Sequence, residues 1–227
     1  MGKKYSKQQI DNLIQDTQDF SKLYAFKFIQ YAGNIKGTKI PYIEYIAERL
    51  LDTGIVDKLK GIQITTRKNS YKVKHSTKSN NKSNRKEEIF AKSLIDKQFD
   101  VLGKIIDYQV PLKNEQKDKC GKIDLVSFNS ESKCVYLIEL KYVSKETLLR
   151  SVLEIATYFQ QLDKDKFLED FNHSGNEIKK AVLILKDSTP YEDFKNLKNM
   201  PNLNELIHML RVSIFVIENI PDIKKVL

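Results

Sequence analysis

Three ionisable residues lie inside two apolar, β-prone runs, "GKIDLVSFN" and "KCVYLIELKYV". Asp124 lies in the first run, and Glu139 and Lys141 lie in the second. A strand that is apolar on both faces is typical of the interior of a sheet. An isolated carboxylate there is costly unless it is paired or binds a metal. The placement therefore indicates either a structural ion pair between Glu139 and Lys141 or a functional site.

The alternation of side chains along the two runs predicts that these charges meet. Glu139 and Lys141 share one face of the second strand, because side chains alternate between the faces. If the chain turns around "NSESK", Asp124 faces a position between Leu137 and Glu139. Two carboxylates on rigid strands suit Mg²⁺ or Mn²⁺, with waters completing the shell. A lysine beside them can position a water and stabilise charge on a phosphate.

The surrounding elements predict how the groups are positioned. Residues 87–227 predict an α/β (α+β) domain, in which helices pack on a mixed sheet that begins as an antiparallel meander. The expected segments, in chain order, are a helix in "EEIFAKSLIDKQ", a strand in "DVLGKIIDYQVPL", the two runs above, a helix in "SKETLLRSVLEIATYFQQLDK", a strand from about Ala181, helices in "TPYEDFKNLKNM" and "NLNELIHML", and a strand in "RVSIFVIEN". In the helix after the third strand, Ser144 is the expected N-cap and Glu146 lies in the first turn.

The first part of the chain has a different composition. Residues 1–64 predict a helical region, with one or two helices in residues 8–31 and another that opens at Pro41. Residues 65–86 contain eight Lys and Arg and no acid, which predicts a linker or a flexible basic loop. This segment is either an arm that follows phosphates or a solvated, disordered connector. Its candidate nucleic-acid-binding residues are Arg67, Lys68, Lys72, Lys74, Arg85 and Lys86.

The charge is distributed unevenly. The chain carries a net charge of +9. Residues 1–86 hold 18 Lys and Arg against 7 Asp and Glu, a net of +11, whereas residues 87–227 hold 21 against 23, a net of −2. This asymmetry favours a polyanionic partner such as nucleic acid. The alternative is a lysine-rich, solvated surface.

The charged strand residues resemble the motif of the PD-(D/E)XK nuclease superfamily, which has the restriction-endonuclease-like fold. The matching residues are Asp124 in "GKIDL" and the triplet from Glu139 to Lys141 in "IELK", while Ile123 stands where the family has proline. The resemblance implies that Asp124 and Glu139 bind the metal through their side chains. It also implies that Leu140 adds its main-chain carbonyl and that Lys141 assists the attacking water.

The helix before the sheet supplies a further candidate by the same resemblance. The superfamily core, α-β-β-β-α-β, matches residues 87 to about 186, and many members carry a glutamate on the first helix. Glu87 is preferred over Glu88, because the apolar residues at +3, +4 and +7 from Glu87 place it on the core-facing side. The catalytic candidates are therefore Glu87, Asp124, Glu139 and Lys141.

The helix after the third strand carries a polar stripe, as in some members of the superfamily. Its residues recur at i, +4, +8 and +11, and they could line the site. Glu154 occupies the glutamine position of the family's Gln-xxx-Tyr signature, so a plain solvated face is the alternative. The stripe consists of Arg150, Glu154, Tyr158 and Gln161.

The expected function is that of a metal-dependent nuclease, with Mg²⁺ or Mn²⁺ as cofactor and DNA as the first-choice substrate. One alternative is a catalytically inactive, nuclease-like module that binds nucleic acid or a partner protein. Another is an interaction subunit whose N-terminal helices dock a second protein. RNA, single or double strands, cleavage at ends or internally, and a homodimer all stay open.

Other classes of protein are not indicated. No apolar run approaches the 18 or so residues of a membrane span, and the N-terminus lacks the apolar core of a secretory signal, so we expect a cytoplasmic protein without membrane contact. Cys120 and Cys134 lie near opposite ends of the two strands, which predicts free thiols. There is no P-loop, G-x-S-x-G or H-E-x-x-H motif, and no spacing links His75, His173 and His208.

Overall fold

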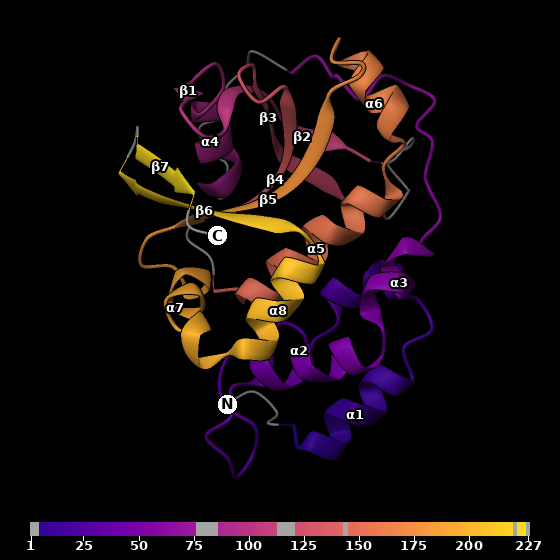
Figure 1. Ribbon diagram of the computed structural model, residues 1–227, viewed down its shortest axis with the longest axis vertical. Coiled ribbons are helices and arrows are strands. Elements are labelled where there is room, and N and C mark those ends of the chain that lie inside the picture. The colour runs from indigo at the N-terminus through magenta and orange to yellow at the C-terminus, as the bar shows by residue number, and fades with distance from the viewer. Residues whose placement is uncertain (1–4, 76–85, 113–120, 143–144, 220–221, 226–227) are drawn as a thin grey trace.

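One mixed β-sheet runs through the molecule and carries helices on both faces (Figure 1). The computed structural model describes residues 5–75, 86–112, 121–142, 145–219 and 222–225. Within them the strands lie side by side in chain order, β1 (Gln98–Phe99), β2 (Gly103–Pro111), β3 (Lys122–Asn129), β4 (Cys134–Lys141), β5 (Glu177–Leu185), β6 (Val212–Asn219) and β7 (Asp222–Lys225). β2, β3 and β4 form an antiparallel meander, and β5 and β6 continue parallel to β4. The predicted mixed sheet flanked by helices is therefore confirmed.

The helices divide between the two faces of this sheet. They are α1 (Lys7–Gln15), α2 (Tyr42–Asp52), α3 (Ile55–Lys60), α4 (Lys86–Ser93), α5 (Leu148–Gln161), α6 (Lys164–Asp170), α7 (Thr189–Lys195) and α8 (Pro201–Met209), with the 3₁₀ helices η1 (Phe20–Ala25) and η2 (Leu197–Asn199). α4 covers one face, where Phe90 and Leu94 join the core. α5 covers the other face together with the N-terminal helices. None of the helices in the described ranges is both long and apolar enough to cross a membrane.

β4 is the central strand of the arrangement. It lies between β3 and β5, and every one of its residues is buried. Val135 and Leu137 pack on the α5 side, whereas Tyr136 and Ile138 pack on the α4 side. This alternation is the one expected from the sequence, and it assigns Glu139 and Lys141 to the α5 side.

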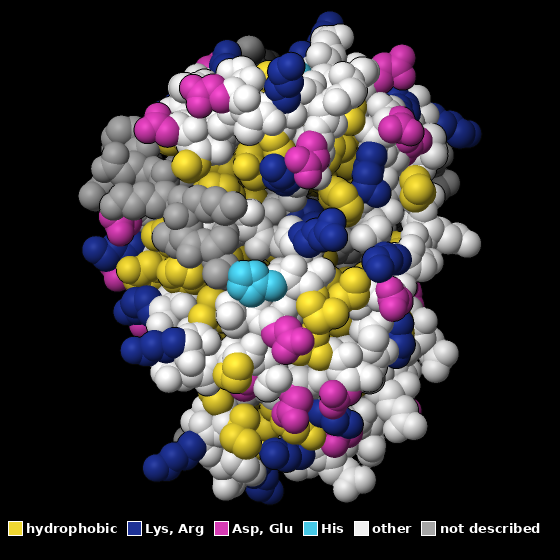
Figure 2. All heavy atoms as spheres, in the orientation of Figure 1, with side chains coloured by type: hydrophobic (Ala, Val, Ile, Leu, Met, Phe, Trp, Pro, Cys, Tyr) yellow, Lys and Arg dark blue, Asp and Glu magenta, His cyan; other side chains and the backbone are white. Residues whose placement is uncertain are grey.

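The N-terminal helices share their core with the sheet. Ile10, Leu23 and Ile46 are buried in the same apolar cluster as Val135 and α5. In Figure 1 these helices lie beneath α5 and α8 as a lower layer. Acidic and basic side chains are interspersed over the face shown in Figure 2, with apolar groups between them.

The expected start of the helix after the third strand is wrong. α5 begins at Leu148, and its N-cap is Thr147, whose side chain accepts a hydrogen bond from the Arg150 N–H at 3.3 Å. Glu146 therefore precedes the helix, and the expected N-cap, Ser144, lies outside the described residues. The strand expected in residues 100–112 is confirmed as β2, and the short β1 before it pairs antiparallel with its start. Gly103 opens β2 with φ of +75°, where a Cβ would collide with the backbone of Phe128.

The described part of the basic segment, residues 65–75, is packed against the domain. Tyr71 is fully buried, its ring centroid lies 5.5 Å from that of Phe167, and its N–H donates to Asp170 Oδ2 at 2.8 Å. Further along, the His75 ring stacks on Tyr108 at 4.0 Å between centroids. The composition indicated a flexible loop because it does not reveal such single aromatic anchors.

A buried glutamate ties the N-terminal helices to the C-terminal half of the chain. Glu44 in α2 accepts hydrogen bonds from the N–H groups of Asn202 at 3.1 Å and Leu203 at 3.0 Å, at the start of α8. We expect Glu44→Ala to lower the free energy of unfolding by about 1–3 kcal/mol, because buried N–H groups lose their acceptor. Urea denaturation measures this change. Glu48→Ala, at an exposed position of α2, is the control, and an equal loss in both variants would contradict the role of Glu44.

Candidate functional site

The candidate site forms where β3 and β4 stop pairing. Their last paired residues are Leu125 and Ile138. At the next position along β3, the Asp124 side chain replaces the backbone as hydrogen-bond acceptor, because its Oδ2 accepts from the Leu140 N–H at 3.0 Å. This register places Asp124 opposite Glu139, within the range expected from the sequence. The structure thus brings both acids to the same side of the sheet.

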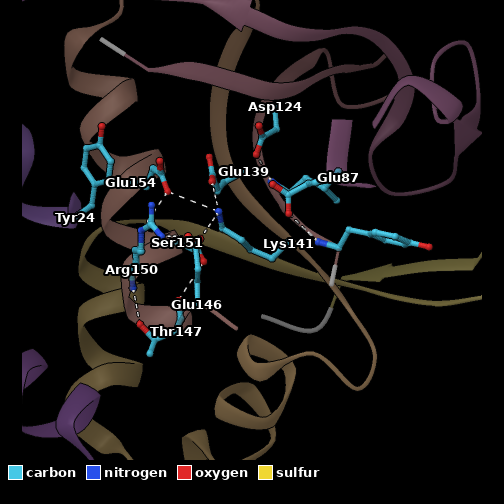
Figure 3. A network of polar contacts seen from close by, with 12 residues as sticks. Tyr24, Glu87, Asp124, Glu139, Lys141, Glu146, Thr147, Arg150, Ser151 and Glu154 are labelled. Atoms are coloured by element: carbon cyan, nitrogen blue, oxygen red, sulfur yellow. Dashed lines mark hydrogen bonds and ion pairs between the residues drawn. The ribbon is translucent and has the colours of Figure 1, made fainter. Parts of the chain in front are cut away.

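Asp124 and Glu139 line a cleft with a volume of about 840 Å³. Figure 3 shows the carboxylates of Asp124, Glu139 and Glu87 pointing toward a common space, from β3, β4 and α4. Glu87 is anchored there, because its Oε2 accepts from the Tyr142 N–H at 3.2 Å. The expected site residues that line the cleft are Lys86, Glu87, Glu88, Asp124, Glu139, Lys141, Arg150, Glu154 and Tyr158.

Lys141 is held by carboxylates from β4, from α5 and from the segment just before α5. Its Nζ lies 2.6 Å from Glu139 Oε1, 2.8 Å from Glu146 Oε2 and 3.7 Å from Glu154 Oε2 (Figure 3). Burial by itself lowers the pKa of Lys141, but the charges of Glu139 and Glu154 outweigh it and raise this pKa above its ordinary value. Lys141 is therefore a firmly protonated ammonium group.

The two strand acids resist ionisation. Burial raises the pKa of Asp124 to about 7, with the Lys141 charge opposing the rise and the Glu87 charge adding to it. Burial also raises the pKa of Glu139 well above its usual range, and the charges of Asp124 and Glu154 raise it further. The physical cause is an excess of negative groups in a desolvated place.

The composition of the site fits a hard divalent cation. Asp124, Glu139 and Glu154 are buried carboxylates, with Lys141 as the buried ammonium among them. In an extended strand the N–H and C=O of one residue point the same way, so the Leu140 carbonyl faces the strand of Asp124. Among the described residues, no three His, Cys, Asp or Glu side chains are grouped to hold a metal ion. Asp124, Glu139 and the Leu140 carbonyl would therefore leave waters to complete the shell, as Mg²⁺ prefers.

Most of the polar stripe on α5 faces the cleft. Arg150 pairs with Glu146, and Glu154 Oε1 accepts from the Tyr158 hydroxyl at 2.9 Å. Glu154 and Tyr158 are 8 % and 4 % exposed, so this part of the stripe is not a solvated face. Gln161 lies further along α5 and lines a neighbouring hollow beside η1.

Sequence reasoning missed three residues that shape the site. Gln109 donates from Nε2 to Asp124 Oδ1 at 2.8 Å, and its φ of +50° follows a bulge in β2. No local sequence signal marks this bulge, because strand irregularities depend on the partner strand. Glu146 was expected in a helix rather than beside Lys141. Tyr24, whose hydroxyl lies 3.4 Å from that of Tyr158, comes from a distant part of the chain.

The expected nucleic-acid-binding residues do not form one surface feature. Lys68, Lys72 and Lys74 are exposed on the packed segment, and Lys86 lies at the cleft. Arg67 is buried and donates to the Ser70 carbonyl at 2.9 Å. Arg85 lies outside the described residues.

The cysteines and histidines stand apart from the cleft. Cys134 is buried and carries a free thiol, while Cys120 lies outside the described residues. His75 stacks on Tyr108, His173 stacks on Phe128, and His208 lies in α8. Their placement supports the reading of the histidines as packing or surface residues.

The comparisons with known proteins are negative. No protein-family model matches the chain, and no curated protein or solved structure is significantly similar to it.

The raised pKa of Asp124 predicts a pH-dependent gain of stability on substitution. An aspartate has a pKa near 3.9 in an unfolded chain, so the folded state holds the extra proton between about pH 4 and pH 7. The stability that Asp124 contributes to the wild type is therefore lost as the pH rises from about 4 to about 7. Asp124→Asn removes this cost, and its amide keeps both hydrogen bonds if Gln109 turns its own amide. In EDTA, we expect the variant to be more stable by about 1–3 kcal/mol at pH 8 and nearly equal at pH 4.

Urea denaturation across this pH range measures the difference. Asp57→Asn is the control, because that carboxylate is 84 % exposed in α3. A stability difference for Asp124→Asn that does not vary with pH would contradict the assigned pKa.

Proposed function

We propose that this chain is a metal-dependent nuclease with a restriction-endonuclease-like core, which hydrolyses phosphodiester bonds of nucleic acid and acts on DNA in the first instance. The observation that carries the proposal is the meeting of Asp124, Glu139 and Lys141 at the divergent ends of β3 and β4. The order of α4, β2, β3, β4, α5 and β5 along the chain, with β1 and α6 as additions, also supports it, because the superfamily core has the same order.

Asp124 and Glu139 would hold Mg²⁺ or Mn²⁺, with the Leu140 carbonyl as a main-chain donor. A cation bound there would polarise the phosphate and offset its developing negative charge. Gln109 fixes the Asp124 carboxylate from one side, and the Leu140 N–H fixes it from the other. These two hydrogen bonds orient the carboxylate before any ligand arrives.

Lys141 would act as a hydrogen-bond donor. Because the surrounding carboxylates keep it protonated, its ammonium group is suited to orient the attacking water or to contact a phosphate oxygen. The water's proton would then pass to a carboxylate or to solvent rather than to Lys141. Glu154 restrains the ammonium group from α5, and Glu146 restrains it from the segment just before that helix.

The rim of the cleft suits a phosphate backbone. Lys86, Lys122 and Lys145 are exposed and line the cleft around its acidic floor. Exposed lysines provide sequence-independent contacts to phosphates. The cleft thus combines a negative interior, which would receive a cation, with a positive margin, which would receive the nucleic acid.

Cleavage assays test the proposal directly. We expect wild-type protein to cleave plasmid or single-stranded DNA with Mg²⁺ or Mn²⁺. Asp124→Asn and Lys141→Met should each lower the rate by about 100-fold or more, because they remove a metal ligand and the charged donor. Asp57→Asn serves as the control and should keep full activity. Equal rates in all variants, or no metal-dependent cleavage in the wild type, would exclude the nuclease.

A second candidate is a nuclease-like module that binds nucleic acid or a partner protein without cleaving. The observation that favours it is the set of ion pairs from Lys141 to three carboxylates, which would also stabilise a purely structural site. Calorimetric titration with Mn²⁺ separates the two. A nuclease should bind the ion in the wild type and lose at least about ten-fold in affinity in Asp124→Asn, whereas a binding module would give no heat in either.

A further inference from the structure

A group of basic side chains surrounds one aromatic ring on the flank of α5 away from the candidate cleft. Phe159 in α5 is approached by Lys164 from α6 and by Lys180 from β5, with Nζ atoms 4.4 Å and 4.5 Å from the ring centroid. Arg211, in the turn between α8 and β6, acts on Lys180 as a further nearby positive charge. In Figure 2, Lys and Arg side chains lie over the part of this face where Figure 1 places α5 and β6.

Acids lie near this group without forming ion pairs with it in the described part of the chain, and Asp165 in α6 acts on Lys164 as a nearby negative charge. Among the described residues, no ion pair joins Lys164, Lys180 or Arg211 to a carboxylate, and Glu177 nearby pairs with Lys179 at 3.1 Å. Burial, together with the charges of Arg211 and Lys164, lowers the pKa of Lys180 to about 8. Like charges held together in a partly desolvated place are costly, and such arrangements are typical of sites that receive a ligand of the opposite sign.

The group borders a cavity that is large enough for a small organic anion. Lys180, Arg211 and Phe159 line a hollow of about 810 Å³, within the size range of small-molecule sites. Apolar side chains such as Leu59 and Met209 form part of its wall. Among the described residues, none that lines this hollow also lines the candidate cleft.

We propose that Lys164, Lys180 and Arg211 bind the phosphate groups of a small phosphorylated ligand of nucleotide size, at a site separate from the cleft. Two ammonium groups supply point charges and the guanidinium supplies a planar pair of donors, a combination suited to a phosphate. The apolar wall suits the organic part of the ligand. A polymer is less well matched, because Lys180 and Arg211 line one hollow and Lys164 contacts the Phe159 ring at its wall, so the charges do not form an extended track. This proposal does not depend on the nuclease function.

Isothermal titration calorimetry with the full-length protein in EDTA tests the site. The probes are ATP, inorganic tripolyphosphate and a short single-stranded oligonucleotide. We expect ATP and tripolyphosphate to bind the wild type. Lys180→Met should weaken both by about ten-fold or more, because it removes a charge and keeps the buried aliphatic stem. Lys195→Met, which removes an exposed charge in α7, is the matched control and should bind as the wild type does.

A second variant tests the site independently, in case Lys180→Met fails to fold. Arg211 has φ of +52°, and asparagine tolerates this conformation, so Arg211→Asn removes the charge with little strain. It should weaken both phosphate probes by a similar factor, and thermal unfolding verifies that the variants are folded. The proposal is overturned if neither phosphate probe binds, if tripolyphosphate fails while ATP binds, if only the oligonucleotide binds, or if folded variants bind as tightly as the wild type.

Discussion

The site depends on the transfer of several carboxylates and one ammonium group out of water at the point where β3 and β4 diverge. Asp124, Glu139 and Glu154 are buried around Lys141, and this burial, together with the excess of carboxylates, raises the pKa of both strand acids. Such an arrangement costs stability in the isolated chain. Proteins retain costs of this kind where a ligand relieves them, and a divalent cation at the two strand acids would do so.

The elements around the site hold these groups against their mutual repulsion. α4 brings Glu87 to the cleft through the Tyr142 N–H, and the bulge in β2 turns Gln109 toward Asp124. α5 carries Glu154 and Tyr158, which connect the site to Tyr24 in the N-terminal region. The helices before the sheet therefore help to hold the cleft in place, because they share the apolar core beneath it and contact its polar network.

The places where charge gathers in the folded protein differ from the charged regions of the sequence. The sequence places the basic excess in residues 1–86, yet the two concentrations of charge that the structure reveals both lie in the later part of the chain. One is the acidic floor of the cleft, and the other is the cationic group around Phe159. They lie on opposite flanks of α5, so a cationic and an anionic ligand could be bound without competing for the same residues.

The sequence by itself determined the strands, their alternation and the meeting of Asp124 with Glu139, because these follow from local periodicity and from a short connection between neighbouring strands. The position of Glu87 and of much of the α5 stripe at the site could also be predicted from the sequence, because helical spacing relates these residues to buried neighbours. Only the tertiary structure decided the roles of Gln109 and Tyr24, the packing of Tyr71 and the cationic group around Phe159. The contacts of Tyr24, Tyr71 and Phe159 join segments that are far apart in the chain, and the orientation of Gln109 follows a strand bulge. No local pattern encodes these features.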